Sequence, residues 1–177
     1  MIDKIILGFL FQKKLTTYDI KLAMDKSISN FYSNSFGSIN PAIKKLEKNE
    51  MIQCTEQVEN SRLKKIYTIT AKGKKSYTHW LKEPIKQGRI KDEVLIRLFF
   101  LADSSKNERK KLITDYLNEL NKSKSELEHT KRELDTMTLT TKQKDKAKYQ
   151  LSTLQFGLDY IKFKVQWFQN LLLEIEK

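Results

Sequence analysis

The sequence contains few of the residues that interrupt helices or cross-link chains. Its 177 residues include only five glycines, two prolines and one cysteine. So few glycines and prolines argue against a disordered or turn-rich all-β chain and favour helices. The single cysteine, Cys54, excludes an internal disulfide, which fits a reducing compartment.

Long apolar runs are also missing. The run IILGFLF near the start is short and is followed by QKK rather than by the small residues of a signal-peptide cleavage site. No run approaches the roughly 18 apolar residues of a membrane-spanning helix. We therefore expect a cytoplasmic protein with no membrane partner.

Residues typical of catalytic and metal sites are scarce. The only two histidines, His79 and His129, lie in different predicted regions, and no His or Cys cluster has metal-ligand spacing. No glycine-rich phosphate loop is present. The sequence predicts no enzyme, no cofactor and no metal site. Cys54 lies in a predicted strand, where a small buried hydrophobe is more typical than a redox sensor.

Positive charge, by contrast, is in excess. The chain has 34 Lys and Arg against 22 Asp and Glu, a net charge of +12. Residues 1–88 hold 16 against 8, net +8, and residues 89–177 hold 18 against 14, net +4. A basic excess suits a nucleic-acid partner but also serves solubility, so charge alone leaves both explanations open.

The first 84 residues predict the element order of a winged helix-turn-helix. Short helices are expected at residues 2–11 and 18–26, the second capped by Thr16 or Thr17, and a third begins between residues 35 and 38. Alternating apolar residues on either side of ENSR predict a β-hairpin, and a helix at residues 71–81 follows. The proline and glycine of KEPIKQGRIK place a boundary between domains at 1–84 and 89–177.

The third helix combines a core face with a basic face. Ile39, Ile43 and Leu46 recur at spacings of four and three, which predicts a buried stripe. Pro41 is tolerated if it lies in the first turn, where the backbone N–H has no intrahelical partner. On the other side Asn40 is the candidate for reading a base edge, and the lysines for neutralising phosphates. A solvated lysine face is the alternative. The candidate DNA-binding residues are Ser35, Phe36, Ser38, Asn40, Lys44, Lys45 and Lys48, with Arg62, Lys64 and Lys65 on the hairpin.

Beyond residue 89 the sequence predicts helices only. Ser105 and Glu108 have capping-box spacing ahead of a long helix with a thin apolar stripe. The last helix repeats apolar residues at alternating steps of four and three over four heptads, which indicates packing along another helix. Packing within an intramolecular bundle is one interpretation. We favour dimerisation, because the preceding helix, with its thin apolar stripe, covers too little of the apolar surface of the last helix. The candidate dimer residues are Leu151, Leu154, Leu158, Ile161, Val165, Phe168 and Leu172.

The same half contains nine of the 18 aromatic residues of the chain. A group of them is a candidate pocket for a flat, apolar effector, and core packing explains the same residues without a ligand. The candidates are Phe99, Phe100, Tyr160, Phe163 and Trp167.

Two segments, SFGSINPAIKKLEKNEMI and KKIYTITAKGKKSYTHWL, resemble the PadR family of bacterial transcriptional regulators. The matching positions are Ser35, Gly37, Ser38, Pro41, Ala42, Leu46, Glu47, Tyr67, Thr70, Gly73, Trp80 and Leu81. The later helices resemble the longer, virulence-activator-like members, whose C-terminal helices form the dimer. The chain departs from the family pattern in three places. Asn40 stands where a tyrosine is usual, Glu50 replaces a glycine, and the hairpin tip lacks a glycine–arginine pattern.

The resemblance implies a mainly α protein, with a winged helix-turn-helix and a small β-hairpin wing ahead of a long-helix dimerisation domain. It also implies a homodimeric regulator that binds double-stranded DNA, with a small aromatic or hydrophobic effector. We expect a repressor. The alternatives are an effector-binding sensor, or a protein-interaction module whose basic winged helix has no specific DNA target.

Overall fold

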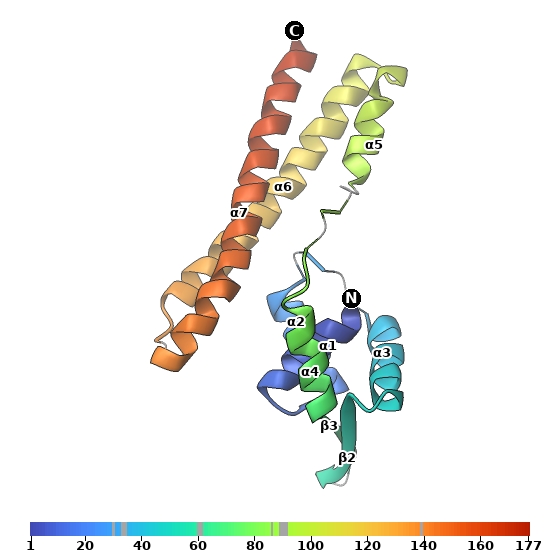
Figure 1. Cartoon of the computed structure of the whole chain (residues 1–177). Coiled ribbons are helices and arrows are strands. Elements are labelled where there is room, and N and C mark those ends of the chain that lie inside the picture. Colours follow the sequence, from blue (N-terminus) through green and yellow to red (C-terminus); the bar gives the residue numbers. More distant parts are fainter. Residues whose placement is uncertain (30, 33–34, 60–61, 86, 89–91, 139) are drawn as a thin grey trace. The chain divides into compact units, whose positions relative to one another are not determined.

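The computed structural model describes the chain except residues 30, 33–34, 60–61, 86, 89–91 and 139, and the side chains of residues 59, 62, 141 and 142. The protein is mainly α-helical with one small sheet, as the sequence predicted (Figure 1). It divides into two compact units, Met1–Gly88 and Arg89–Lys177. Among the described residues no helix is long and apolar enough to cross a membrane.

The first unit has the predicted element order with one addition. The unexpected element is β1, a strand of two residues that pairs with β3, so the sheet has three strands in the antiparallel order β1-β3-β2. The elements are α1 (Ile2–Gln12), β1 (Leu15–Thr16), α2 (Thr17–Ser27), α3 (Phe36–Lys48), β2 (Ile52–Glu59), β3 (Arg62–Ile69) and α4 (Ala71–Trp80).

The core of this unit is built from one face of each helix and the inner face of the sheet. Ile6, Leu7 and Leu10 of α1 are buried, as are Ile20 and Met24 of α2. Two other apolar residues of α2, Tyr18 and Leu22, are exposed. Their spacing to Ile20 and Met24 is two residues, which a helix places on a different side. Each fully buried aliphatic side chain contributes about 1.5–3 kcal/mol.

Helix α3 begins where the sequence predicted, with Ser35 at the N-cap. Pro41, however, lies in the second turn rather than the first, because five helical residues precede it. The residue four positions earlier is Gly37, whose carbonyl therefore receives no hydrogen bond from residue 41. The buried residues Ile39, Ala42, Ile43 and Leu46 hold the helix in the core despite this loss.

The end of α3 shows how the chain turns without the usual glycine. Glu50 takes up the left-handed conformation with φ of 58°. The Glu50 N–H donates to the Glu47 carbonyl at 2.8 Å and the Met51 N–H to the Leu46 carbonyl at 2.9 Å. This is the paired hydrogen-bond pattern of a Schellman cap, which normally uses glycine at this position. A non-glycine residue in that conformation costs on the order of 1 kcal/mol.

The second unit consists of a short helix and a long helical hairpin. Ser105 and Glu108 form the predicted capping box, and the hydrogen bonds from Ser105 lower the pKa of the Glu108 carboxyl. The elements are α5 (Glu93–Phe99), the 3-10 turn η1 (Leu101–Asp103), α6 (Lys106–Asp135) and α7 (Thr141–Glu176).

The apolar stripe of α7 packs against α6 within the same chain. Leu158, Val165 and Phe168 are buried, and the last two share a cluster with Ile113 and Leu117 of α6. The assignment of these three residues to a dimer interface therefore needs correction, because a side chain buried inside the chain offers little to a partner. Four other predicted interface residues are half-buried: Leu151, Leu154, Ile161 and Leu172.

A half-buried ion pair ties the start of α5 to α7. The Lys164 Nζ lies 2.6 Å from an Asp92 carboxylate oxygen, and the other carboxylate oxygen accepts a hydrogen bond from the Val94 N–H. The ammonium also lies over the rings of Tyr116 and Tyr160, at 5.2 and 5.5 Å. Burial acts to lower the pKa of Lys164, but the hydrogen bonds with Asp92 and Tyr116 outweigh it and raise the pKa. Asp92 thus fixes both the start of α5 and its position on α7.

Candidate nucleic-acid interface

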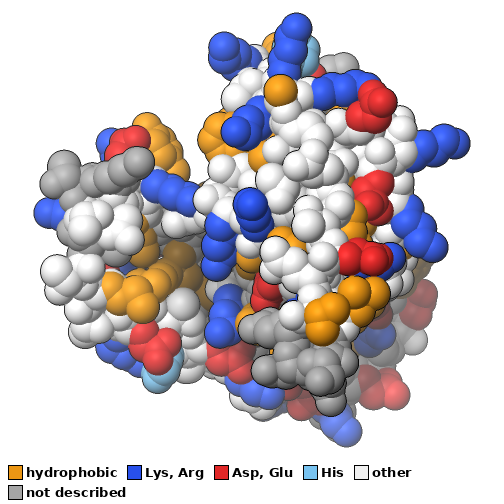
Figure 2. Space-filling view, turned by 90° about the horizontal axis from the view of Figure 1, so that it is seen from below, with side chains coloured by type: hydrophobic (Ala, Val, Ile, Leu, Met, Phe, Trp, Pro, Cys, Tyr) orange, Lys and Arg blue, Asp and Glu red, His pale blue; other side chains and the backbone are white. Residues whose placement is uncertain are grey.

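The outer side of α3 presents a polar row to solvent. Asn40, Lys44 and Lys48 follow one another at intervals of four residues, so they lie along one side of the helix, and all three are exposed. The residues that anchor the helix, such as Ile39 and Ile43, lie on the opposite side. Lysine and arginine side chains project from many points of the surface in Figure 2, with acidic side chains between them.

Lys45 differs from its neighbours in having a local partner. Its Nζ lies 2.7 Å from a carboxylate oxygen of Asp3 on α1. The pair is largely exposed, so it contributes little to stability, but it partly neutralises this lysine. Of the three lysines assigned to this surface, Lys44 and Lys48 are consequently the better candidates for meeting phosphates.

The start of α3 brings polar and aromatic groups beside this row. The Ser38 hydroxyl donates to the Ser35 carbonyl at 2.9 Å and accepts from the Ser35 N–H at 3.3 Å. Phe36 is exposed, and the Lys21 Nζ of α2 lies 6.0 Å from its ring centre. Sequence reasoning did not include Lys21, because nothing in its spacing indicated that α2 reaches the start of α3.

The hairpin carries the remaining candidates on its two faces. Lys65 lies opposite Glu56 in the strand register, and their charged groups are 3.5 Å apart. Lys64 is paired in register with Gln57 on the other face. The backbone of Arg62 pairs with Glu59, while its side chain lies outside the described residues.

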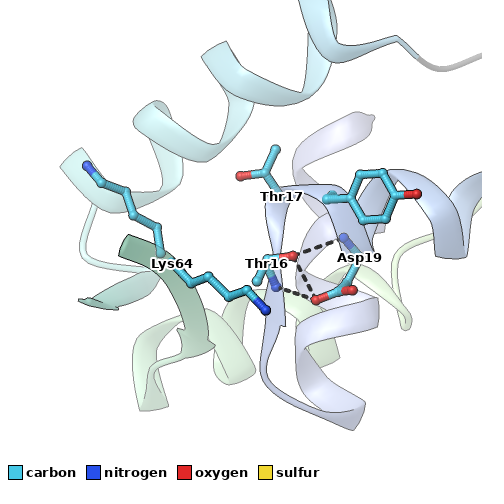
Figure 3. Close-up of a pocket in the computed structure, with 6 residues that line it drawn as sticks. Thr16, Thr17, Asp19 and Lys64 are labelled. Carbon is cyan, nitrogen blue, oxygen red and sulfur yellow. Dashed lines mark hydrogen bonds between the residues drawn. The ribbon is translucent and has the colours of Figure 1, made fainter. Parts of the chain in front are cut away.

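A shallow hollow lies between β3 and the start of α2 (Figure 3). Thr16 and Asp19 form a capping box in which the Asp19 carboxylate accepts hydrogen bonds from the Thr16 N–H at 3.0 Å and hydroxyl at 2.7 Å. These hydrogen bonds lower the pKa of Asp19. Lys64 and Lys65 line the same hollow. The Asp19 carboxylate already occupies this helix end, where it caps α2. The hollow is therefore not a second anion site.

The five aromatic residues proposed for an effector pocket are largely exposed. Phe99, Phe100 and Phe163 are more than half exposed, and Tyr160 and Trp167 nearly so. Two hollows in the described part of the molecule are lined by other residues. Burial in a core therefore does not account for this aromatic group.

Cys54 and the histidines carry no sign of a reactive site. Cys54 lies half-buried against the core of the first unit, and burial raises the pKa of its thiol. A raised pKa disfavours the nucleophilic thiolate. Among the described residues no group of three His, Cys, Asp or Glu side chains is placed to hold a metal ion.

Comparison with known proteins gives the class of this architecture. The model of the transcriptional regulator PadR-like family matches residues 6–79, and that of the virulence activator alpha C-terminal domain matches residues 90–176. The fold and these matches define a winged-helix transcriptional regulator with a C-terminal helical domain. The chain belongs to the PadR-like family, whose members are transcriptional regulators and not enzymes.

Individual relatives cover nearly the whole chain. It is 28% identical to the negative transcriptional regulator PadR of Bacillus subtilis over 97% of its length and 96% of that protein. Bacillus subtilis PadR in complex with operator DNA matches with a TM-score of 0.87, 27% identity and 98% coverage of both chains. The structure of the same protein in complex with p-coumaric acid matches with a TM-score of 0.82, 26% identity and 99% coverage of both chains. The Vibrio cholerae virulence activator AphA, 20% identical, shares the fold with a TM-score of 0.80 over 99% of this chain and 98% of that one.

Proposed function

We propose that the chain is a sequence-specific DNA-binding repressor that places α3 in the major groove of its operator. The observation that carries this proposal is the exposed row of Asn40, Lys44 and Lys48 above a fully buried opposite side. Lysines along a helix neutralise phosphates on either side of the groove, and an amide forms two hydrogen bonds with adenine. Such a regulator acts in the cytoplasm, where bacterial DNA lies.

The relatives support both parts of this proposal. Bacillus subtilis PadR, which is 27% identical to this chain, has been solved in complex with operator DNA. The same relative is named a negative transcriptional regulator. The rival readings predict either no DNA target or only a secondary one. Selection of bound duplexes from a random pool distinguishes them, because a specific regulator prefers its site by roughly a thousandfold or more over random DNA.

We expect Asn40→Ala to reduce specificity more than general affinity. Loss of a bidentate contact to a base costs about 1–3 kcal/mol at one position of the site and leaves phosphate contacts in place. Binding of the variant to the selected operator and to random duplexes, measured by electrophoretic shift, tests this expectation. An equal loss on both DNAs would contradict base reading by Asn40. Asn121→Ala serves as the control, because it removes an exposed asparagine from α6, outside the proposed DNA surface.

We also propose that the protein is a homodimer that uses the exposed side of α7 together with α5. Phe156, Tyr160, Phe163 and Trp167 follow steps of four and three on α7 and remain exposed. On α5 and just after it, the exposed apolar residues are Leu95, Ile96, Phe99 and Phe100. An apolar surface of this extent is typical of a protein–protein interface. A two-fold dimer would space two α3 helices over two operator half-sites.

We expect Phe163→Glu to convert the dimer to a monomer of 20.9 kDa in light scattering. A carboxylate in the middle of an apolar interface loses its hydration without gaining a partner, which costs several kcal/mol. Lys162→Glu is the matched control, because it places the same carboxylate at the adjacent exposed position on α7. A wild-type protein that is monomeric at all concentrations would contradict the dimer.

An effector is the second candidate function. We propose a small aromatic acid as the ligand of this chain, because the relative from Bacillus subtilis has been solved with p-coumaric acid. Saturable quenching of Trp167 fluorescence by such an acid is the measurement that tests this proposal, and an unchanged signal at millimolar ligand counts against it.

A further inference from the structure

Helix α5 has little core contact of its own. Of its seven residues, all of them described, only Val94 is buried, and Leu98 packs half-buried against the same cluster of α6 and α7. A helix of this length does not form alone in water, because its few hydrogen bonds do not offset the cost of the first turn. Burial of one side chain offsets only a small part of the conformational entropy that seven ordered residues lose. The docking of α5 on its own chain is therefore marginal.

Two polar contacts hold the ends of this segment. At its start the Lys164 Nζ of α7 lies 2.6 Å from an Asp92 carboxylate oxygen, and the two side chains are only 14% and 23% exposed. After its end the Arg109 guanidinium of α6 donates to the carbonyl oxygens of Ala102 and Ser104, at 2.9 and 2.8 Å. Loss of either partner from an ion pair that water reaches so little leaves the other charge poorly solvated. We call the Asp92–Lys164 pair the latch, because it joins the N-cap of α5 to α7.

The remaining apolar side chains of α5 and of the residue after it are uncovered. They are Leu95, Ile96, Phe99 and Phe100, each 45–82% exposed. The aromatic row of α7 continues this surface at the latch, because the Lys164 Nζ lies 5.5 Å from the ring centre of Tyr160. A second copy that covers both parts packs against α5 from the side opposite its own chain. Binding that requires the docked form of α5 also stabilises that form.

We propose that the latch between Asp92 and Lys164 couples the docking of α5 to dimerisation. This inference rests on the proposed homodimer and gives a role in it to an ion pair within one chain. With the latch closed, α5 presents its apolar side chains to the second copy. With the latch open, α5 leaves α7, and the dimer surface loses its α5 part. The latch thereby sets the protein concentration at which two linked α3 helices are available to one operator.

The test compares full-length variants that remove one charge of the latch at a time. Asp92→Asn keeps the size of the side chain and an oxygen for the N-cap but removes the carboxylate. Lys164→Met keeps an unbranched apolar stem and removes the ammonium. Asp115→Asn is the matched control, because it makes the same chemical change at an exposed position of α6 outside the latch. Analytical ultracentrifugation measures the dimer dissociation constant, and hydrogen exchange with mass spectrometry follows the α5 amides at concentrations where each variant is dimeric.

We expect each single latch variant to weaken the dimer by roughly tenfold or more, because every dimer contains two latches and a lone, partly buried charge is unfavourable. The α5 amides of these variants should exchange faster. The amides of α6 and α7 should keep wild-type protection, which shows that the variants are folded. The double variant of Asp92→Asn and Lys164→Met should dimerise more tightly than Asp92→Asn alone, because it leaves no ammonium without a partner. The control should match wild type in both measurements.

Three outcomes would overturn the coupling, and they are distinguishable. Single latch variants with the dissociation constant of wild type show that dimerisation does not depend on the latch, even if α5 exchanges faster, and the homodimer itself then stands. A double variant whose weakening is the product of the two single effects shows that the pairing of the charges plays no part. If wild type is monomeric at all concentrations, the proposed homodimer fails, and the coupling fails with it.

Discussion

Replacing Lys44 and Lys48 together with alanine should weaken operator binding by roughly a hundredfold and flatten its salt dependence. A charge-assisted contact contributes about 1.5–3 kcal/mol net, which corresponds to roughly tenfold or more for each lysine. The slope of log affinity against log salt should fall by about two, since each phosphate contact contributes about one. Electrophoretic shifts at several salt concentrations measure both quantities.

The positions of Lys44 and Lys48 make them the lysines most suited to contact phosphates. Both lie in the exposed row of α3, and among the described residues neither is paired with a carboxylate. Loss of their charge should weaken binding to operator and to random DNA alike, because phosphates carry no sequence information. This distinguishes the lysines from Asn40, whose replacement should weaken binding to the operator more than binding to random DNA.

Two single variants serve as controls for the loss of charge. Lys45→Ala removes a lysine that Asp3 already partly neutralises, so a smaller change in slope is expected. Lys111→Ala removes an exposed lysine from α6 in the second unit and should leave the slope unchanged. A double variant of Lys44 and Lys48 with the slope of wild type would contradict the assignment of α3 to the DNA surface.

Strongly periodic segments of the fold were predictable because helical burial repeats. Ile39, Ile43 and Leu46 indicated the buried side of α3 correctly, and Ser105 indicated the start of α6. Strand β1 was not predictable in this way, because two residues have no period. The Glu50 turn was recognised only as a departure from a family pattern, and its left-handed backbone needed the structure.

The candidate sites were harder to predict because the sequence does not say what covers a surface. The heptad stripe of α7 predicted a packed helix correctly, but Val165 and Phe168 pack on α6 of the same chain. An apolar heptad pattern is the same whether the partner helix belongs to the same chain or to a second copy. The aromatic residues Phe156, Phe163 and Trp167 of the same helix stay exposed instead.

Gly73→Ala should destabilise the first unit by about 3 kcal/mol, the upper end of the usual cost of overpacking. A Cβ at this position would lie 2.1 Å from the Met51 carbonyl oxygen and 2.8 Å from the Ile69 Cγ1. The Met51 carbonyl accepts the Thr70 N–H at 3.1 Å, and the Thr70 hydroxyl accepts the Gly73 N–H, also at 3.1 Å. The added methyl group would therefore push apart the junction where the end of α3, the last residue of β3 and the start of α4 meet.

The measurement requires a probe of the first unit alone. Trp80 lies in this unit and Trp167 in the other, so the fluorescence of Trp80 in a Trp167→Phe background reports its unfolding. A loss of about 3 kcal/mol should lower the melting temperature by more than roughly 10 °C for a unit of this size. Gly37→Ala in the same background is the control, because among the described residues its Cβ would meet the Ser35 Oγ alone, at an ordinary contact distance of 3.5 Å.

The two glycines should change stability in opposite directions because they lie in different surroundings. Alanine at position 37 lies in open space within a helix and should stabilise it by up to about 1 kcal/mol. At position 73 the obstacle is a backbone carbonyl held by the Thr70 N–H and by the cap of α3, so it has little freedom to move aside. If Gly73→Ala melts like wild type, this junction tolerates displacement. In that case the strained turn at Glu50 does not depend on the close packing of α4.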